Sequence, residues 1–302
     1  MKIDLHIHSK DGSDGHWNLA EIFAEGAERR QIDLISITDH DSISAQGLAV
    51  ELARSYGIAY ITGVELNVSF SHPGYRGGKP VSLDCLGYQY DIDNVVLVEK
   101  LEALRDFRKK RAMRILENLN RAFAQEGRPA FSMADLDAIE AGVDGALGRP
   151  HIAKYMVNKG IVATVQEAFD RYLVACDVPK MPLSLQKASE LIRGAGGKLI
   201  LAHPNDPNGT SLVNLTSSVK EQVRIIHDAM MAYIDGIECW HSRHDTETTV
   251  AYTTFARGMG LIVSGGSDCH QQPVLMGEVD VPGYVGEQFL QGLHSAVRGA
   301  TR

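Results

Sequence analysis

The sequence lacks any long uninterrupted run of apolar residues. Hydrophobic residues make up 44% of its 302 positions, yet no stretch approaches the roughly 20 apolar residues that a membrane-spanning helix needs. The N-terminus also lacks a basic segment followed by an apolar stretch and a cleavage site, so no secretory signal peptide is expected. These absences argue against a membrane or exported protein and favour a cytoplasmic one.

Cysteine is scarce as well. The chain has four cysteines, widely spaced and with no CxxC pair: Cys85, Cys176, Cys239 and Cys269. This usage predicts reduced thiols, as in a cytoplasmic protein.

Positive charge is in deficit. The chain has 30 Lys and Arg residues against 38 Asp and Glu residues, for a formal net charge of −8. An acidic balance argues against general affinity for nucleic acid, although a local basic patch can still bind one phosphorylated ligand.

Short apolar runs alternate with amphipathic helical patterns over much of the chain, which predicts a parallel sheet in an α/β fold. At this length a βα barrel is favoured over an open sheet. The expected strands cover residues 2–8, 33–38, 59–67, 81–88, 198–203, 236–240 and 261–267.

The middle of the chain interrupts this alternation. Residues 94–183 have helical patterns without a convincing strand, with helices expected at 95–125, 133–141, 150–159 and 165–175. We therefore expect a barrel formed by residues 1–93 and 184–302, with 94–183 as a small helical insertion that caps the substrate site.

Acidic residues and histidines cluster where the predicted strands end. His6 and His8 are two residues apart on the first strand, so their side chains project from the same face, about 7 Å apart along the backbone. Because active sites of βα barrels lie at the C-terminal ends of the strands, the clusters predict a metal site built from nitrogen and oxygen donors. They are His6 with His8, Asp39-His40-Asp41, Glu65, Asp84, His203, and Asp268 with His270.

The order DLHIHS, SDG, ITDHD, GVE, LAHP and GGSDCH resembles the PHP (polymerase and histidinol phosphatase) family, within the amidohydrolase-like metal enzymes. The resemblance covers roughly residues 1–90 and 195–280. It implies a distorted (β/α)7 barrel that holds two or three divalent ions, Mn, Zn or Fe, for phosphoester hydrolysis.

Matched residue by residue, the resemblance implies three ion sites. His6, His8, Glu65 and Asp268 would bind one ion. Glu65 and His203 would bind a second, and His40 and His270 a third, together with an Asp of the first loop.

Two positions depart from the family pattern. The loop after His8 is one residue longer than expected, so Asp11 and Asp14 compete for one ligand role, and Asp14 fits the SDG motif better. Asp84 stands where relatives of this type usually have a histidine. An Asp can still bind the second ion, but it adds negative charge, which leaves the count of three ions open.

The helical insertion contributes cationic residues for a phosphate. Arg105 and Arg108 lie on adjoining turns of one helix face, and a solvated basic surface explains them as well as a substrate contact does. Pro150 at a helix start places Arg149 and His151 at a helix N-terminus, a natural site for an anion. This GRPH segment also resembles one in nucleotide-phosphatase-like PHP proteins.

The expected activity is hydrolysis of a small nucleotide or sugar phosphate, as a monoester or a cyclic ester, by in-line attack of a metal-activated water on phosphorus. Glu65 and Asp268 would hold the reacting centre, and His241, which follows a strand, is a candidate substrate contact or proton donor. Two alternatives stay open: a 5′-3′ exonuclease on short RNA or DNA, and a non-catalytic metal- or nucleotide-binding module.

Overall fold

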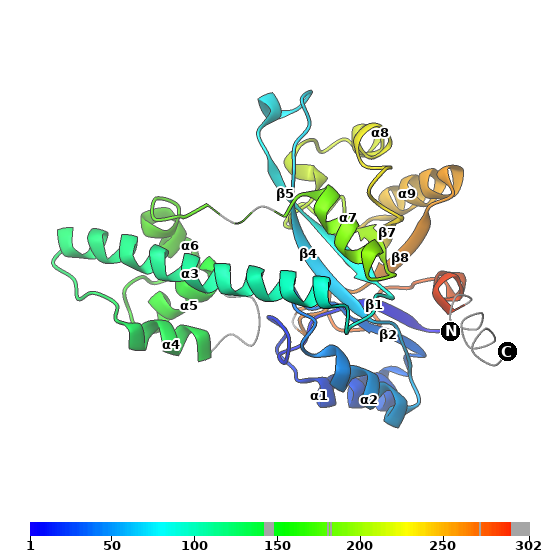
Figure 1. Ribbon diagram of the computed structural model, residues 1–302, viewed down its shortest axis with the longest axis horizontal. Helices are drawn as coiled ribbons and strands as arrows, with labels where there is room; N and C mark the ends of the chain where they lie inside the picture. The colour runs from blue at the N-terminus through cyan, green and yellow to red at the C-terminus, as the bar shows by residue number, and fades with distance from the viewer. Residues whose placement is uncertain (142–147, 180, 182, 272, 291–302) are drawn as a thin grey trace. The chain divides into compact units, whose positions relative to one another are not determined.

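The computed structural model describes residues 1–141, 148–179, 181, 183–271 and 273–290 (Figure 1). The chain divides into two compact units. One consists of Met1–Val98 and Pro182–Arg302, and the other of Glu99–Met181. Within the described residues, no helix combines the length and the apolar character that a membrane crossing requires.

The strands of the first unit form two sheets. Three parallel strands, ordered β1-β2-β3, make the first sheet, and five strands, ordered β4-β5-β6-β7-β8, make the second. The strands are β1 (Ile3–Ile7), β2 (Leu34–Ile37), β3 (Ala59–Tyr60), β4 (Gly63–Phe70), β5 (Val81–Tyr88), β6 (Lys198–Leu201), β7 (Gly236–His241) and β8 (Ile262–Gly266).

The fold is mixed α/β as predicted, but the described strands do not close into one barrel, and they are not all parallel. Strand β5 is antiparallel to both β4 and β6. Residues 71–80, which join β4 to β5, are too few for the crossover connection that parallel strands require. The predicted strand 59–67 is also divided between the two sheets, as β3 and β4.

Two isolated bridges connect the sheets. Ile7 pairs with Cys269 beyond β8, and His40 beyond β2 pairs with Glu65 of β4. Both connections fall at or beside predicted ligands. The positions at which the two sheets meet are therefore also the positions of the candidate site.

The side chain of Gln46 ties the end of β2 to the start of β4. Its amide nitrogen donates to the carbonyls of Ile37 and Gly63, at 2.9 and 2.8 Å, and its oxygen accepts from the Gly63 N–H and the Tyr60 hydroxyl, at 3.2 and 2.8 Å. Gln46 is completely buried. It thus replaces the strand pairing that is missing between the two sheets.

Side-chain N-caps begin four described α-helices of this unit. Asn18 and Glu21 form a capping box at α1, and Ser184, Ser218 and Asp245 cap α7, α8 and α9. The helices are α1 (Leu19–Ala24), which continues as the π-helical η1 (Glu25–Arg30), then α2 (Gln46–Tyr56), α7 (Leu185–Gly194), α8 (Val219–Ala229) and α9 (Thr246–Met259), with the short 3₁₀ turns η2 (Arg76–Gly78) and η4 (Leu212–Asn214).

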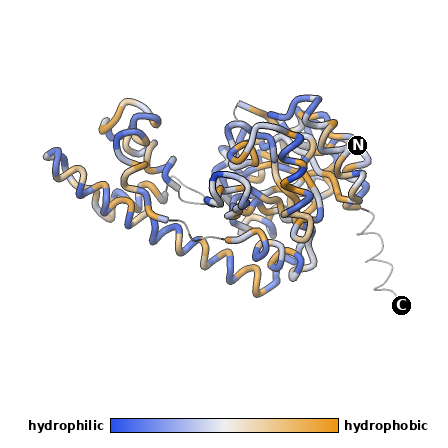
Figure 2. Tube along the Cα trace, turned by 90° about the horizontal axis from the view of Figure 1, so that it is seen from above, coloured by the Kyte–Doolittle hydropathy of each residue, from blue (hydrophilic) through white to orange (hydrophobic). Residues whose placement is uncertain are grey.

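The described regular elements of the second unit are all helices. Apolar and polar segments alternate along its helices (Figure 2), and Ile115, Leu119 and Phe123 of α3 pack against Ile152 and Tyr172 in its core. The elements are α3 (Val95–Gln125), whose first turn belongs to the first unit, α4 (Met133–Ala141), α5 (Arg149–Asn158), α6 (Val165–Ala168) and the π-helical η3 (Phe169–Leu173).

Replacing Gln46 by Leu should lower the free energy of unfolding by about 2–5 kcal/mol, because it leaves buried backbone and hydroxyl groups without partners. Urea unfolding measures the difference. Gln186→Leu is the matched control, since Gln186 is exposed on α7 and should change the value by no more than about 0.5 kcal/mol. Equal effects of both substitutions would contradict the role given to Gln46.

Candidate metal centre

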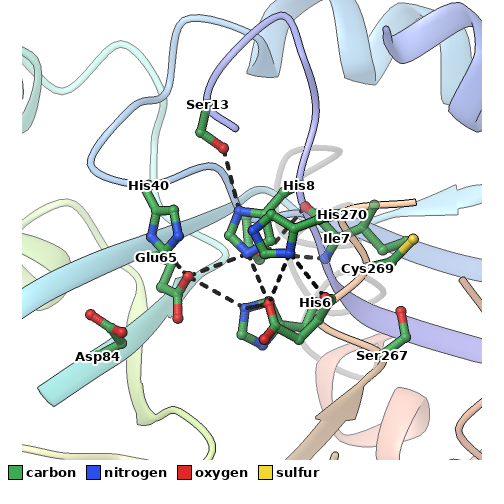
Figure 3. Close-up of polar contacts among 12 residues, drawn as sticks. His6, Ile7, His8, Ser13, His40, Glu65, Asp84, Ser267, Cys269 and His270 are labelled. Atoms are coloured by element: carbon green, nitrogen blue, oxygen red, sulfur yellow. Dashed lines mark hydrogen bonds and ion pairs between the residues drawn. The ribbon is translucent and has the colours of Figure 1, made fainter. Parts of the chain in front are cut away.

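Glu65 lies at the centre of the candidate site, where its carboxylate contacts four imidazoles. Figure 3 labels three of these histidines, His6, His8 and His40, beside it. Its Oε2 lies 3.5 Å from His6 Nε2, 3.3 Å from His8 Nε2 and 3.0 Å from His40 Nδ1. Its Oε1 lies 3.0 Å from His203 Nε2. The side chain is 1% exposed. Histidines of β1 and of the segments after β1, β2 and β6 therefore meet at a carboxylate of β4.

Asp268, directly after β8, completes a second set of contacts. Its Oδ1 lies 3.4 Å from His6 Nε2 and 3.2 Å from His8 Nε2. The two histidines of the first strand segment project to the same side, as predicted, with ring centroids 5.2 Å apart. The two histidines predicted to bind the first ion thus each contact both of its predicted carboxylates, Glu65 and Asp268.

Asp14 faces a third group of donors. Its Oδ1 lies 3.2 Å from His270 Nε2, 3.8 Å from His40 Nε2 and 3.8 Å from His8 Nδ1. Asp11 instead accepts a hydrogen bond from the Leu19 N–H, at 2.7 Å, at the start of α1. The longer loop is therefore accommodated by Asp11 at the helix terminus, while Asp14 lies among the histidines.

The donor set fits divalent ions. Each of three groups brings its donor atoms within 4.8 Å of one another: His8 with Asp14, His40 and His270; His6 with His8 and Asp268; and His6 with Glu65 and His203. Buried donor atoms without a hydrogen-bond partner in the described structure include His6 Nε2, His8 Nε2, Asp14 Oδ1, Glu65 Oε2 and His203 Nδ1. Unsatisfied buried polar atoms are costly, and imidazole nitrogens with carboxylate oxygens suit Zn, Mn or Fe.

Known proteins resemble the chain over most of its length, although no protein-family model matches the sequence. A 3′,5′-nucleoside bisphosphate phosphatase from Chromobacterium violaceum is 28% identical over 281 residues, covering 89% of this chain and 87% of the relative. A 5′-3′ exoribonuclease from Haemophilus influenzae is 29% identical over 272 residues, covering 89% of this chain and 90% of the relative.

Similarity extends to a solved structure. A protein from Bifidobacterium adolescentis, named as a metal-dependent phosphoesterase, superposes with a TM-score of 0.74 at 28% identity, with 95% of each chain covered. The chain is thus similar over most of its length to metal-dependent phosphoesterases, in keeping with the resemblance of its motifs to the PHP family. The predicted enzyme class, a metal-dependent phosphoric ester hydrolase, is confirmed at this level.

Asp84, on β5, lies outside the three donor groups. Asn67 Nδ2 donates to its Oδ1 at 2.7 Å, and the Thr210 hydroxyl donates to its Oδ2. Burial and the negative charge of Glu65 raise the pKa of Asp84 to about 6. The sequence located this residue near the site, but its hydrogen-bond partners come from distant segments and could not be inferred.

His241 ends β7 beside the cluster. Its Nε2 lies 3.4 Å from Asp268 Oδ2, and its Nδ1 accepts from the Arg243 backbone N–H at 3.2 Å. The imidazole is buried. The structure thus brings this predicted residue to the same carboxylate that contacts His6 and His8.

Sequence reasoning missed Glu238, which is fully buried on β7 and lies 3.0 Å from His6 Nδ1. A charged residue inside the apolar strand run GIECW was the available signal. Asp39, grouped with His40 by sequence, accepts hydrogen bonds from Ser9 and Ser13, each at 2.7 Å. Asp39 therefore shapes the first loop.

The cationic residues of the second unit have defined surroundings. Arg149 Nη1 lies 2.9 Å from Asp177 Oδ2, and Asp177 also pairs with the buried Arg111. His151 Nδ1 accepts from the Gly148 N–H at 3.1 Å, which caps α5. Arg105 is exposed and Arg108 half-buried on α3, in the same unit.

The charge distribution of the cluster favours protonated histidines when no cation is bound. Burial alone lowers the pKa of an imidazole, but the surrounding carboxylates, Glu65 above all, together outweigh it and raise the pKa of His40 to about 10 and that of His203 to about 9. Burial and these histidines act oppositely on Glu65, and the histidines hold its pKa well below the usual range. Bound cations would therefore replace protons in this site.

Replacing Asp84 by Asn should stabilise the metal-free protein, and more so at high pH. A folded-state pKa near 6 lies above that of an unfolded Asp, about 3.9. The wild-type carboxyl therefore destabilises the fold progressively as pH rises from about 4 through 6. Urea unfolding in chelator at pH 5 and pH 8 should show an advantage of the variant that grows by about 1–3 kcal/mol.

An advantage independent of pH would contradict the raised pKa of Asp84. Asp93→Asn is the control for that comparison, because Asp93 is exposed.

Proposed function

We propose that this chain hydrolyses a small phosphorylated metabolite, a nucleotide or sugar phosphate, with divalent ions held by the histidine and carboxylate cluster. The convergence of His6, His8, His40 and His203 on Glu65 carries the proposal. Divalent ions bound there would lower the pKa of a coordinated water to about 7 and would neutralise negative charge on phosphoryl oxygens.

The residues divide among the proposed ion sites as the family resemblance implies. His6, His8, Glu65 and Asp268 would hold one ion. Glu65 and His203 would hold a second, with Asp84 joining if its Oδ2 exchanges the Thr210 hydroxyl for the ion. Asp14, His40 and His270 would hold a third. The three groups of closely spaced donor atoms overlap with these three sets of residues and support the assignment.

His241 is proposed to handle the proton of the leaving group. An imidazole that contacts Asp268 through Nε2 can carry a proton at that atom and deliver it to an oxygen placed beside the same carboxylate. Because His241 is buried, that proton would be sheltered from bulk water.

Substrate selection is proposed to involve the helical unit. Arg149 and His151 would contact a second phosphate group of the substrate, with Arg105 and Arg108 adding positive charge. Arg149 Nη1 pairs with Asp177 Oδ2, which orients the guanidinium, and its other N–H groups would donate to the phosphate oxygens. The bisphosphate phosphatase among the relatives supports a substrate with two phosphate groups.

A second candidate is 5′-3′ exonuclease activity on short RNA. The similarity to the exoribonuclease is as extensive as that to the phosphatase. A 5′-phosphorylated oligoribonucleotide and adenosine 3′,5′-bisphosphate, assayed side by side, separate the two functions by their specificity constants. For location, we propose the cytoplasm, since the four cysteines are free and buried thiols.

Removing metal should abolish phosphate release from adenosine 3′,5′-bisphosphate, and Mn, Zn or Fe should restore it. Mass spectrometry of the protein before and after chelation measures the ions in parallel with the assay. Full turnover in a sample shown to be metal-free would overturn the proposed function.

Asp14→Asn should lower the number of ions bound per chain, because its carboxylate faces His270 and His40. Asp11→Asn is the matched control. Asp11 lies in the same loop but accepts from the Leu19 N–H at the start of α1, so this variant should leave the metal content unchanged. A loss confined to the Asp11 variant would reverse the assignment of these two residues.

Arg149→Gln should raise KM for adenosine 3′,5′-bisphosphate about 10- to 100-fold, the loss expected for a hydrogen bond to a charged group. The KM for AMP, which has one phosphate, should change little. Arg121→Gln, on an exposed position of α3, serves as the control. Equal losses for both substrates would show that Arg149 does not contact a second phosphate.

A further inference from the structure

Glu238 occupies an unusual place for a carboxylate. It lies within strand β7 between Ile237 and Cys239, and all three residues are fully buried. A buried charge is costly unless it is paired and hydrogen-bonded. The partners of Glu238 therefore indicate why the strand carries it.

Both oxygens of Glu238 contact proposed ligand residues. Oε1 lies 3.0 Å from Nδ1 of His6, and Oε2 accepts from the backbone N–H of His203 at 2.7 Å. An ionised carboxylate can only accept hydrogen bonds. The proton of neutral His6 must therefore reside on Nδ1, which leaves the lone pair on Nε2.

That lone pair points into the cluster. His6 Nε2 lies 3.5 Å from Glu65 Oε2 and 3.4 Å from Asp268 Oδ1, and no described residue forms a hydrogen bond with it. Ligating histidines commonly donate their other N–H to a carboxylate, which fixes ring orientation and tautomer.

The second contact acts on backbone conformation. His203 has a φ of +23°, in a region that side-chain-bearing residues rarely adopt and that must be maintained by its surroundings. The hydrogen bond from its N–H to Glu238 holds this conformation, and it places His203 Nε2 at 3.0 Å from Glu65 Oε1.

We propose that Glu238 is a positioning residue that fixes the tautomer of His6 and the backbone of His203, and thereby couples the two ion sites that these histidines serve. The inference rests on the ligand roles given under the proposed function. Glu238 itself binds no ion in this scheme. It acts through one side chain and one backbone group on two different sites.

Glu238→Gln tests the coupling with almost no change in shape. The amide has one acceptor oxygen, whereas two donors face the wild-type carboxylate. If its NH₂ faces His6, Nδ1 must accept, and the His6 proton moves to Nε2, the atom needed for the ion. If its NH₂ faces His203, two donors oppose each other and the backbone loses its support. Either orientation disrupts one ligand.

Zinc affinity, measured by competition with a chromophoric chelator, should therefore fall about 10- to 100-fold in the variant, and fewer ions should remain per chain after dialysis. Asp206→Asn is the matched control, a buried carboxylate that pairs with Arg243, and should keep wild-type affinity. Wild-type zinc affinity in Glu238→Gln would overturn the inference while leaving the proposed function intact.

A measurement on the wild-type protein protects the test against a variant that fails to fold. Nitrogen-15 NMR of the zinc-loaded enzyme should show His6 protonated at Nδ1 and bound to zinc through Nε2. Zinc bound through His6 Nδ1 would overturn the inference. A wild-type chain that binds no zinc, manganese or iron would overturn both the inference and the proposed function.

Discussion

The contact between the Glu65 carboxylate and four imidazoles is the interaction on which the rest of the site depends. The four histidines come from three segments that are far apart in the sequence, and neighbouring polar groups position three of them. Glu238 holds His6 and His203, and the loop shaped by Asp39 presents Ser13 to His8. The attraction between the negative carboxylate and the protonated imidazoles offsets the free-energy cost of burying both.

Glu65 also joins the two sheets of the first unit. Strands β2 and β4 belong to different sheets, and their bridge runs through His40 and Glu65. The second bridge joins Ile7 to Cys269, the residue between Asp268 and His270. The irregular backbone that interrupts strand pairing between the sheets therefore also presents the metal-donor side chains. The Gln46 side chain forms hydrogen bonds with the unpaired backbone groups of Ile37 and Gly63. Fold and site share one set of constraints.

The strand positions, the helices of the second unit and the metal-site clusters were predictable because each depends on local periodicity or on residues adjacent to a strand end. The antiparallel setting of β5 depends instead on which strand ends lie beside it. Glu238 was concealed because one acid in an apolar strand has no periodic signature. The pairing of Arg111 with Asp177 was equally hidden, since the two residues lie 66 positions apart and meet through packing.

Exposure is graded across the donors, and this has a kinetic consequence. His6, His8 and Glu65 are at most 1% exposed, whereas Asp14, His40 and His270 are 27–37% exposed. An ion held by the inner group has protein on nearly every side, while one held by the outer group faces solvent. The proposed ions would then exchange at different rates: the inner ones would be retained when free metal is removed, and the outer one would equilibrate with the surrounding metal supply.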